Sequence, residues 1–181
     1  MLRITIPAKE VWDERNQEFI NTKECTLQLE HSLVSLSKWE SNWCKPFLSQ
    51  NAPTEDEMND YIQCMTITQN VDPNVYRVIP KDVRNQINMY INAPMTATWF
   101  NETKSKGRSS SEQITSELIY YWMIALNIPF ECQKWHLNRL LTLIRVCNVK
   151  NEPAKKRSKK EIYSSNAARN AARKKKLNTK G

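Results

Sequence analysis

The stretch ITSELIYYWMIALNIPFECQKWHLNRLLTLIRVCNV, from Ile114 to Val149, decides the fold. It holds most of the long apolar side chains of the C-terminal half, in two helix-length segments separated by Pro129. The second segment follows the i, i+3, i+4, i+7 spacing of one helix face at Leu137, Leu140, Leu141 and Ile144. The stretch therefore predicts two long helices that form much of a hydrophobic core.

The first of these helices is expected to follow the capping sequence Ser110-x-x-Gln113. Its expected inner face consists of Ile114, Leu118, Tyr121, Trp122 and Ala125. Asn127-Ile128-Pro129 predicts a tight turn, with Pro129 as the first residue of the second helix. Because so short a turn makes consecutive helices neighbours, we expect an antiparallel helical hairpin. Glu152-Pro153 is expected to end it.

The rest of the chain predicts one small ribbon and several helices. Leu2, Ile4 and Ile6 alternate with polar residues, as in a half-buried strand, and Glu18–Asn21 is its expected partner. Helices are predicted at four places: residues 26–43; residues 54–66, opened by the capping box Thr54-x-x-Glu57; a short turn from Asp72-Pro73; and residues 80–93, burying Val83, Ile87 and either Ile91 or Tyr90. The polar residues 101–111 are expected to form a mobile loop.

Composition supports the same fold class. The 181 residues include only 2 glycines, whereas β architectures with tight turns depend on glycine for positive φ. We therefore predict a mainly α fold. Residues 1–150 form a compact helical domain with a small N-terminal β-ribbon, and residues 151–181 form a basic tail that is partly disordered or helical.

The net charge of +8 is unevenly distributed. The segment from Lys150 to Gly181 contains 12 Lys or Arg and 2 Glu residues, a net charge of +10, which leaves −2 for the remainder. The body is thus nearly neutral and does not resemble a dedicated nucleic-acid surface. The tail is expected to bind a nucleic acid nonspecifically or an acidic protein, or only to aid solubility.

Five widely spaced cysteines, without a CxxC pair, indicate reduced thiols in a cytosolic protein. The start of the chain lacks the apolar run of a signal peptide, and no run approaches the roughly 18 apolar residues that span a membrane. We expect no membrane association and no cofactor.

One pair of residues has the spacing of a metal or nucleophile site. Cys132 and His136 are four residues apart on the predicted second helix, where two ligands can meet. A metal site would need two more ligands, from His31, Cys64 or Cys147, and none is close in sequence. A Cys–His nucleophile pair lacks an orienting third group. A buried thiol and a hydrogen-bonded imidazole are the preferred interpretation, and an enzyme is not expected.

Several long phrases resemble one family of small proteins encoded among the tail genes of long-tailed phages and prophages. They are TLQLEHSLVSLSKWES (26–41), MTITQNVDPNVY (65–76), APMTATWF (93–100), ITSELIYYWMIALNIPFECQKWHLNRLLTLIRVC (114–147) and RNAARKKKLNTKG (169–181). The resemblance covers most of the chain. It implies a non-enzymatic tail assembly chaperone that shields the tape measure protein in the bacterial host cytoplasm, before the tail tube polymerises.

On this hypothesis the helical hairpin supplies an apolar contact and the tail an electrostatic one. The expected apolar contact is made by Leu118, Trp122, Trp135, Leu140 and Ile144. The expected electrostatic contact is made by Lys155, Lys156, Arg157, Lys159, Lys160, Arg169, Arg173, Lys174, Lys175 and Lys176. Two alternative functions stay open: a structural tail or connector component of the virion, and a nucleic-acid-binding accessory protein that acts through the tail. Self-association into a homo-oligomer is compatible with each of these functions.

Overall fold

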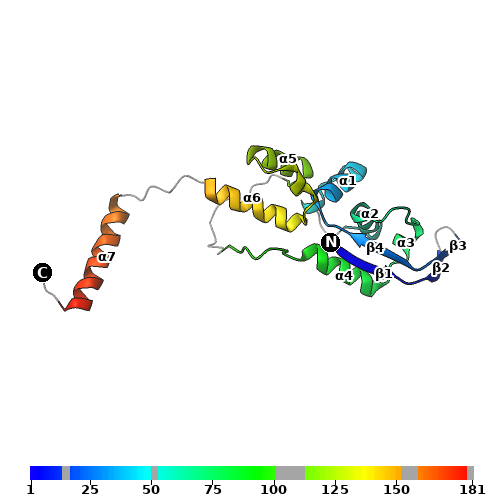
Figure 1. Ribbon diagram of the computed structural model, residues 1–181, viewed down its shortest axis with the longest axis horizontal. Helices are drawn as coiled ribbons and strands as arrows, with labels where there is room; N and C mark the ends of the chain where they lie inside the picture. The colour runs from blue at the N-terminus through cyan, green and yellow to red at the C-terminus, as the bar shows by residue number, and fades with distance from the viewer. Residues whose placement is uncertain (14–16, 50–52, 101–112, 152–158, 179–181) are drawn as a thin grey trace. The chain divides into compact units, whose positions relative to one another are not determined.

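The computed structural model describes residues 1–13, 17–49, 53–100, 113–151 and 159–178. Within these ranges the chain forms seven α-helices, two short 3-10 helices and four strands, which confirms the mainly α fold class with an N-terminal ribbon (Figure 1). The chain divides into two compact units, Met1–Asn148 and Val149–Gly181. The expected loop at residues 101–111 lies outside the described residues.

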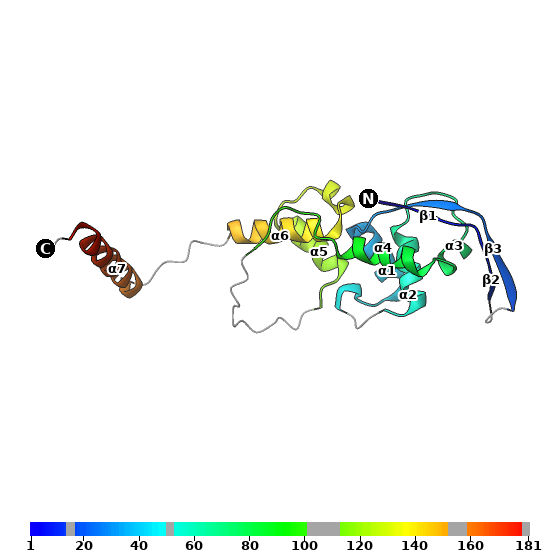
Figure 2. The same ribbon diagram turned by 90° about the horizontal axis from the view of Figure 1, so that it is seen from below.

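The ribbon consists of two antiparallel pairs. Strand β1 (Leu2–Ile6) pairs with β4 (Cys25–Leu29), with Leu2 opposite Leu29. Strand β2 (Lys9–Asp13) pairs with β3 (Glu18–Thr22), and these two continue the ribbon beyond a bend (Figure 2). The prediction that Glu18–Asn21 pairs with the first strand is therefore wrong, because that segment pairs with a second strand instead.

Helix α1 (Leu33–Trp43) begins seven residues later than predicted. Leu27 and Leu29 are buried and alternate with Thr26 and Gln28, so this segment is strand β4. Ser32 then caps α1 in a reciprocal capping box with Ser35. The predicted start of this helix at residue 26 is thus wrong. Leu29, Leu33 and Leu36 share a helical spacing even though Leu29 lies in a strand.

The helices predicted between residues 54 and 93 are confirmed. Both hydrogen bonds of the Thr54–Glu57 capping box are present at the start of α2 (Glu55–Met65). Helix α3 (Asn74–Arg77) follows Asp72-Pro73, and α4 (Lys81–Asn92) follows Pro80. The buried residues of α4 are Val83, Ile87 and Tyr90. A 3-10 helix, η1 (Phe47–Ser49), lies between α1 and α2.

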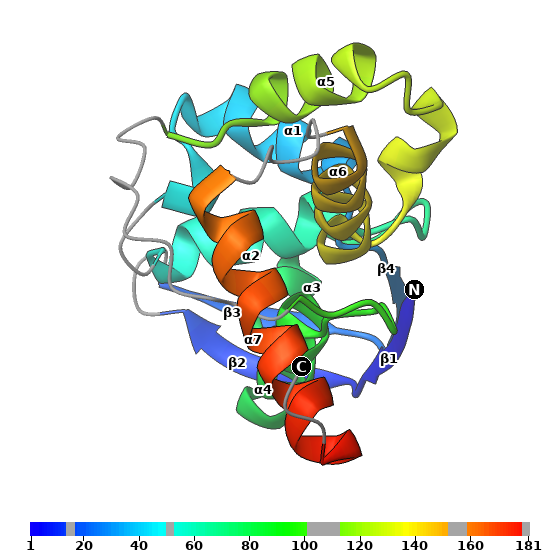
Figure 3. The same cartoon turned by 90° about the vertical axis from the view of Figure 1, so that its left-hand side faces the viewer.

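Two clusters of buried side chains make up the core of the first unit. The first joins the β1–β4 ribbon to α2, α3 and α4, and includes Ile6, Leu27, Trp39, Tyr61, Ile62 and Ile87. The second joins α1, α5 (Ser116–Ala125), η2 (Phe130–Lys134) and α6 (Leu137–Asn151), and includes Leu33, Leu36, Ile119, Met123, Leu137, Leu140 and Ile144. Figure 3 shows α5 beside α1. Helix α1 contributes side chains to both clusters.

The predicted helical hairpin is only partly correct. Pro129 precedes the 3-10 helix η2 rather than opening α6, and α5 packs against α1. Thr115 caps α5, whereas Ser110 lies outside the described residues. The buried residues of α5 are Ser116, Ile119 and Met123, so the predicted inner face is wrong. Of that face, Ile114, Tyr121 and Ala125 are exposed, and Leu118 and Trp122 are half-buried.

The second unit is built around α7 (Lys159–Leu177), a helix of 19 residues. The sequence predicts a tail that is partly disordered or helical, and its described part is helical. Nearly all of its described side chains are exposed, and the last turn is basic.

Candidate functional site

The structure buries part of the predicted apolar contact surface. Leu140 and Ile144 are 0% and 4% exposed and belong to the second core cluster. They cannot contact a partner without unpacking that core. Leu118, Trp122 and Trp135 are half-buried and stay accessible at their edges. The predicted contact is therefore reduced to these three side chains.

A different apolar surface is exposed on α5 and η2. Tyr121 and Ile124 of α5 are 63% and 62% exposed, and Phe130 of η2 is 54% exposed. We call these three residues the α5 outer face. A helix that is apolar on every side is normally buried all round, whereas α5 buries only one side. The nearly continuous apolar run from Leu118 to Leu126 is the sequence signal that identifies this surface.

A buried carboxylate, that of Glu40, binds the first residue of α5. Glu40, near the end of α1, accepts a hydrogen bond of 2.7 Å from the backbone N–H of Ser116 and one of 3.1 Å from that of Phe47. A carboxylate at a helix N-terminus satisfies a free N–H and favours the positive end of the helix dipole. Glu40 thus fixes the start of α5 and, through it, the position of the outer face.

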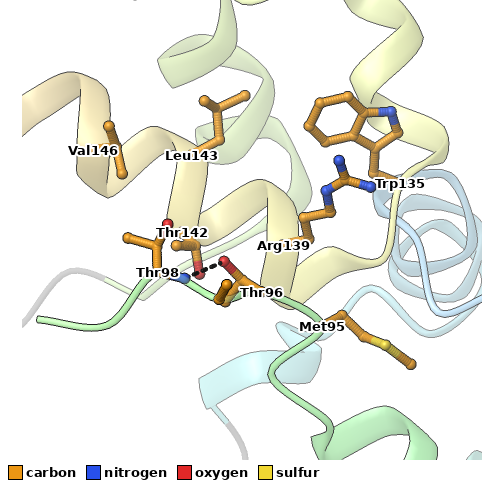
Figure 4. A pocket seen from close by; sticks show the side chains of 9 residues that line it. Met95, Thr96, Thr98, Trp135, Arg139, Thr142, Leu143 and Val146 are labelled. Carbon is orange, nitrogen blue, oxygen red and sulfur yellow. Dashed lines mark hydrogen bonds between the residues drawn. The ribbon is translucent and has the colours of Figure 1, made fainter.

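A groove runs beside α6 (Figure 4). It encloses about 490 Å³ and is lined by Met95, Thr96, Ala97 and Thr98 on one side and by Trp135, Arg139, Thr142, Leu143 and Val146 on the other. The guanidinium of Arg139 lies 4.2 Å from the Trp135 ring centroid, and that of Arg145 lies 4.1 Å from the Phe100 ring centroid. These are cation–π distances.

The described lining of the groove combines apolar side chains and three threonines with one positive charge. Among these described lining residues Arg139 is the only charged one, and α6 contains no acidic residue. Asn138, at the start of α6, donates hydrogen bonds of 2.9 Å to the carbonyl oxygens of Ile91 and Ala93. These bonds tie the end of α4, and the residue that follows it, to the start of α6.

The two histidines of the chain meet where the two core clusters join. The ring centroids of His31 and His136 are 5.0 Å apart. Nδ1 of His31 is hydrogen bonded to the Tyr61 hydroxyl, and Nε2 of His136 donates to the Tyr90 carbonyl oxygen at 3.0 Å. Among the described residues, Nδ1 of His136 is a buried side-chain atom without a hydrogen-bond partner. The contact links β4, α2, α4 and α6.

Both imidazoles are held in their neutral form. Burial, with a smaller contribution from His136, lowers the pKa of His31 from 6.5 to about 3. Burial also lowers the pKa of His136, against the opposing effect of its bond to Tyr90. Burial raises the pKa of Tyr61. The site is therefore neutral and closed near pH 7, which suits a structural contact rather than proton transfer to a substrate.

The predicted Cys132–His136 pair is not on one helix. Cys132 lies in η2, whereas His136 precedes α6 and faces His31 and Tyr90. Burial, followed by the charge of Glu131, raises the pKa of the Cys132 thiol, which disfavours the thiolate. In the described part of the chain, no three or more His, Cys, Asp or Glu side chains gather as metal ligands would.

The predicted electrostatic contact falls in the second unit. Lys155, Lys156 and Arg157 lie outside the described residues. The other seven predicted residues belong to α7: Lys159, Lys160, Arg169, Arg173, Lys174, Lys175 and Lys176. None of the helices that the structure describes has the length and apolar character needed to cross a membrane.

Comparison of this chain with models of known protein families, with curated proteins and with solved structures finds no match.

Proposed function

We propose that the protein is a tail assembly chaperone that binds and shields apolar helical segments of a phage tape measure protein. The observation that carries this proposal is the α5 outer face. Tyr121 and Ile124 are exposed on α5, whose other side already fills the core, and Phe130 is exposed on the following element, η2. Tyr121 and Ile124 are neighbours at i and i+3 of the helix, and exposed large apolar side chains that adjoin one another are typical of a protein interaction surface. The phrases of the sequence that resemble the phage family supply the identity of the client.

The chemistry of such a client fits these surfaces. A long helical chain with apolar stripes aggregates until its final partner covers them. Helix recognition in other systems uses apolar side chains at i, i+3, i+4 and i+7 against an apolar groove or face. Tyr121 and Ile124 stand at positions i and i+3 of α5 and offer one such row. Half-buried Trp122 borders this row.

The groove beside α6 offers a second contact, which favours a client segment with a negative charge. Leu143 and Val146 supply apolar area, and Arg139 supplies a guanidinium already oriented by Trp135. A client segment with a carboxylate beside apolar side chains complements this lining. Release then requires only that tube subunits cover the same client stripes more completely, so no chemical step is involved.

Co-expression with the tape measure protein tests this function. The intact chain is expected to raise the soluble yield of the tape measure protein severalfold. The double variant Tyr121→Ser/Ile124→Ser is expected to lose most of that effect while it stays folded. Met89→Ser is the matched control, because Met89 is 74% exposed on α4, outside the proposed surface.

Two results would contradict the proposal. One is an equal soluble yield of the tape measure protein with and without the chain. The other is the presence of the chain in purified phage particles at a fixed number of copies, measured by mass spectrometry. That second result would favour a structural component of the virion.

A further inference from the structure

We infer that helix α7 is a binding element for double-stranded DNA that inserts one face into the major groove. This inference goes beyond the proposed chaperone function and does not depend on it. It rests on how the helix over Lys159–Leu177 distributes its amide, basic and alanine side chains around its axis.

The first observation is a tandem repeat. Residues 166–173 read NAARNAAR, so Asn166 and Asn170 are four residues apart, as are Arg169 and Arg173. Side chains at i and i+4 lie above each other on one helix face. The helix therefore carries a row of two amides beside a row of two guanidiniums. All four side chains are exposed.

The second observation is the arrangement of charge around the amide row. At 3.6 residues per turn, Arg169 and Arg173 flank the asparagines on one side and Lys174 flanks them on the other. Recognition helices in DNA complexes share this order: amides and guanidiniums reach base edges, and flanking cations bind phosphates. Alanines occupy much of the opposite side, at Ala167, Ala168, Ala171 and Ala172.

The third observation separates nucleic acid from an acidic protein as the partner. Protein grooves bind helices through large apolar anchors, and Ser164–Lys176 contains none. The segment Lys159–Leu177 has seven basic residues and one acidic residue, a net charge of +6. A polyanion offsets the repulsion along this helix. The exposed large apolar side chains of α7, Tyr163 and Leu177, lie near its two ends, so the basic stretch between them offers a protein groove no large apolar anchor.

The dimensions of α7 also fit. A helix of 19 residues is about 28 Å long, and the B-form major groove, about 12 Å wide, admits an α-helix. The major groove of an RNA duplex is too narrow for side chains to read. The geometry thus favours duplex DNA over duplex RNA.

Fluorescence anisotropy of the full-length chain with a labelled DNA duplex of about 20 base pairs, in about 0.1 M salt, tests the inference. We expect micromolar or tighter binding, and weakening by about 10-fold to 100-fold in Arg169→Ala/Arg173→Ala. The control Lys38→Ala/Lys134→Ala removes two exposed cations from the first unit and is expected to change the affinity by less than about threefold. Because alanine favours helix, lost binding in the arginine variant does not reflect a lost helix.

A neutral variant tests the groove contact separately. Asn166→Ala/Asn170→Ala keeps every charge, and we expect it to weaken binding to the duplex about threefold to 10-fold while leaving binding to heparin unchanged. Four results would overturn the inference: no binding of the duplex by the intact chain; equal losses in the arginine variant and its control; unchanged DNA binding in the asparagine variant; or competition by polyglutamate as effective as that by DNA at equal charge. The last result would identify an acidic protein as the partner.

Discussion

Helices α4 and α5 have similar lengths and each buries three side chains, yet their outer faces differ. Helix α4 exposes Asp82, Asn85 and Gln86, with Met89 as its only exposed large apolar residue. Helix α5 exposes Tyr121 and Ile124. The apolar residues of α4 are thus mostly those its core needs, whereas α5 carries more than its core uses. An apolar excess that folding does not require indicates a surface for a partner.

The sharpest test of this difference compares two neighbouring residues of α5. Met123 is fully buried, and Ile124 is mostly exposed. We expect Met123→Ala to lower the free energy of unfolding by about 2–5 kcal/mol, because it leaves a cavity in the core. Ile124→Ala is expected to change it by less than about 0.5 kcal/mol. Urea denaturation measures both, and similar losses would show that Ile124 contributes to the core.

The contacts that hold the two helices offer a second test. Glu40 accepts bonds from two backbone N–H groups, one of them at the start of α5. Asn138 donates to two carbonyl oxygens at the end of α4. We expect Glu40→Ala to cost about 2–4 kcal/mol and Asn138→Ala about 1–2 kcal/mol, because bonds to a charged group are the stronger and their loss strands buried donors. Thermal unfolding of both variants measures these losses. A larger loss of stability in Asn138→Ala than in Glu40→Ala would contradict the greater strength assigned to the Glu40 bonds.

Acid should weaken the junction between the α4 side and the α5 side of the core. The pKa of His31 is lowered in the folded state to about 3, so below pH 6.5 the unfolded chain binds protons that the folded chain does not. The stability is therefore full above pH 6.5 and falls as the pH drops toward 3. At pH 5 the expected loss from His31 is about 2 kcal/mol.

Urea denaturation at pH 7 and pH 5 measures this loss. His31→Gln is the control, and its stability is expected to depend less on pH in this interval. An intact chain with equal stability at both pH values would contradict the neutral, buried state of His31.

The smallest expected effect concerns the second unit. Deleting residues 152–181 removes α7. Because both core clusters consist of side chains of the first unit, the deletion should change the free energy of unfolding of that unit by less than about 0.5 kcal/mol. Circular dichroism of the shortened chain checks this. A loss of several degrees in the melting temperature would mean that α7 supports the body, and the DNA-binding inference would then need a second role for it.

Local signals in the sequence predicted local structure well. The Thr54–Glu57 capping box located α2 because both partners lie within one turn. Local signals could not predict which segments pair when they are far apart in the sequence. Leu27 and Leu29 became a strand because β1 is available to pair with them. The contact between His31 and His136 likewise depends on the tertiary fold.

The candidate site shows why helical periodicity has a limit. Nearly every residue from Leu118 to Leu126 is apolar, so several faces of α5 are equally plausible as the inner one. The packing of Ile119 and Met123 with the second core cluster selects one of them. The excess of apolar residues was visible in the sequence, but the identity of the exposed ones was not.

The end of strand β4 has a consequence for how the chain folds during synthesis. The backbone N–H of Glu30 donates to the Met65 carbonyl oxygen at 2.9 Å, and the His31 carbonyl oxygen accepts from the Leu137 N–H at 2.7 Å. The backbone of Glu30 and His31 is therefore synthesised well before Met65 and Leu137, the residues with which it forms these hydrogen bonds. Contacts so distant in sequence close slowly. We expect the nascent chain to stay protease-sensitive until α6 has emerged.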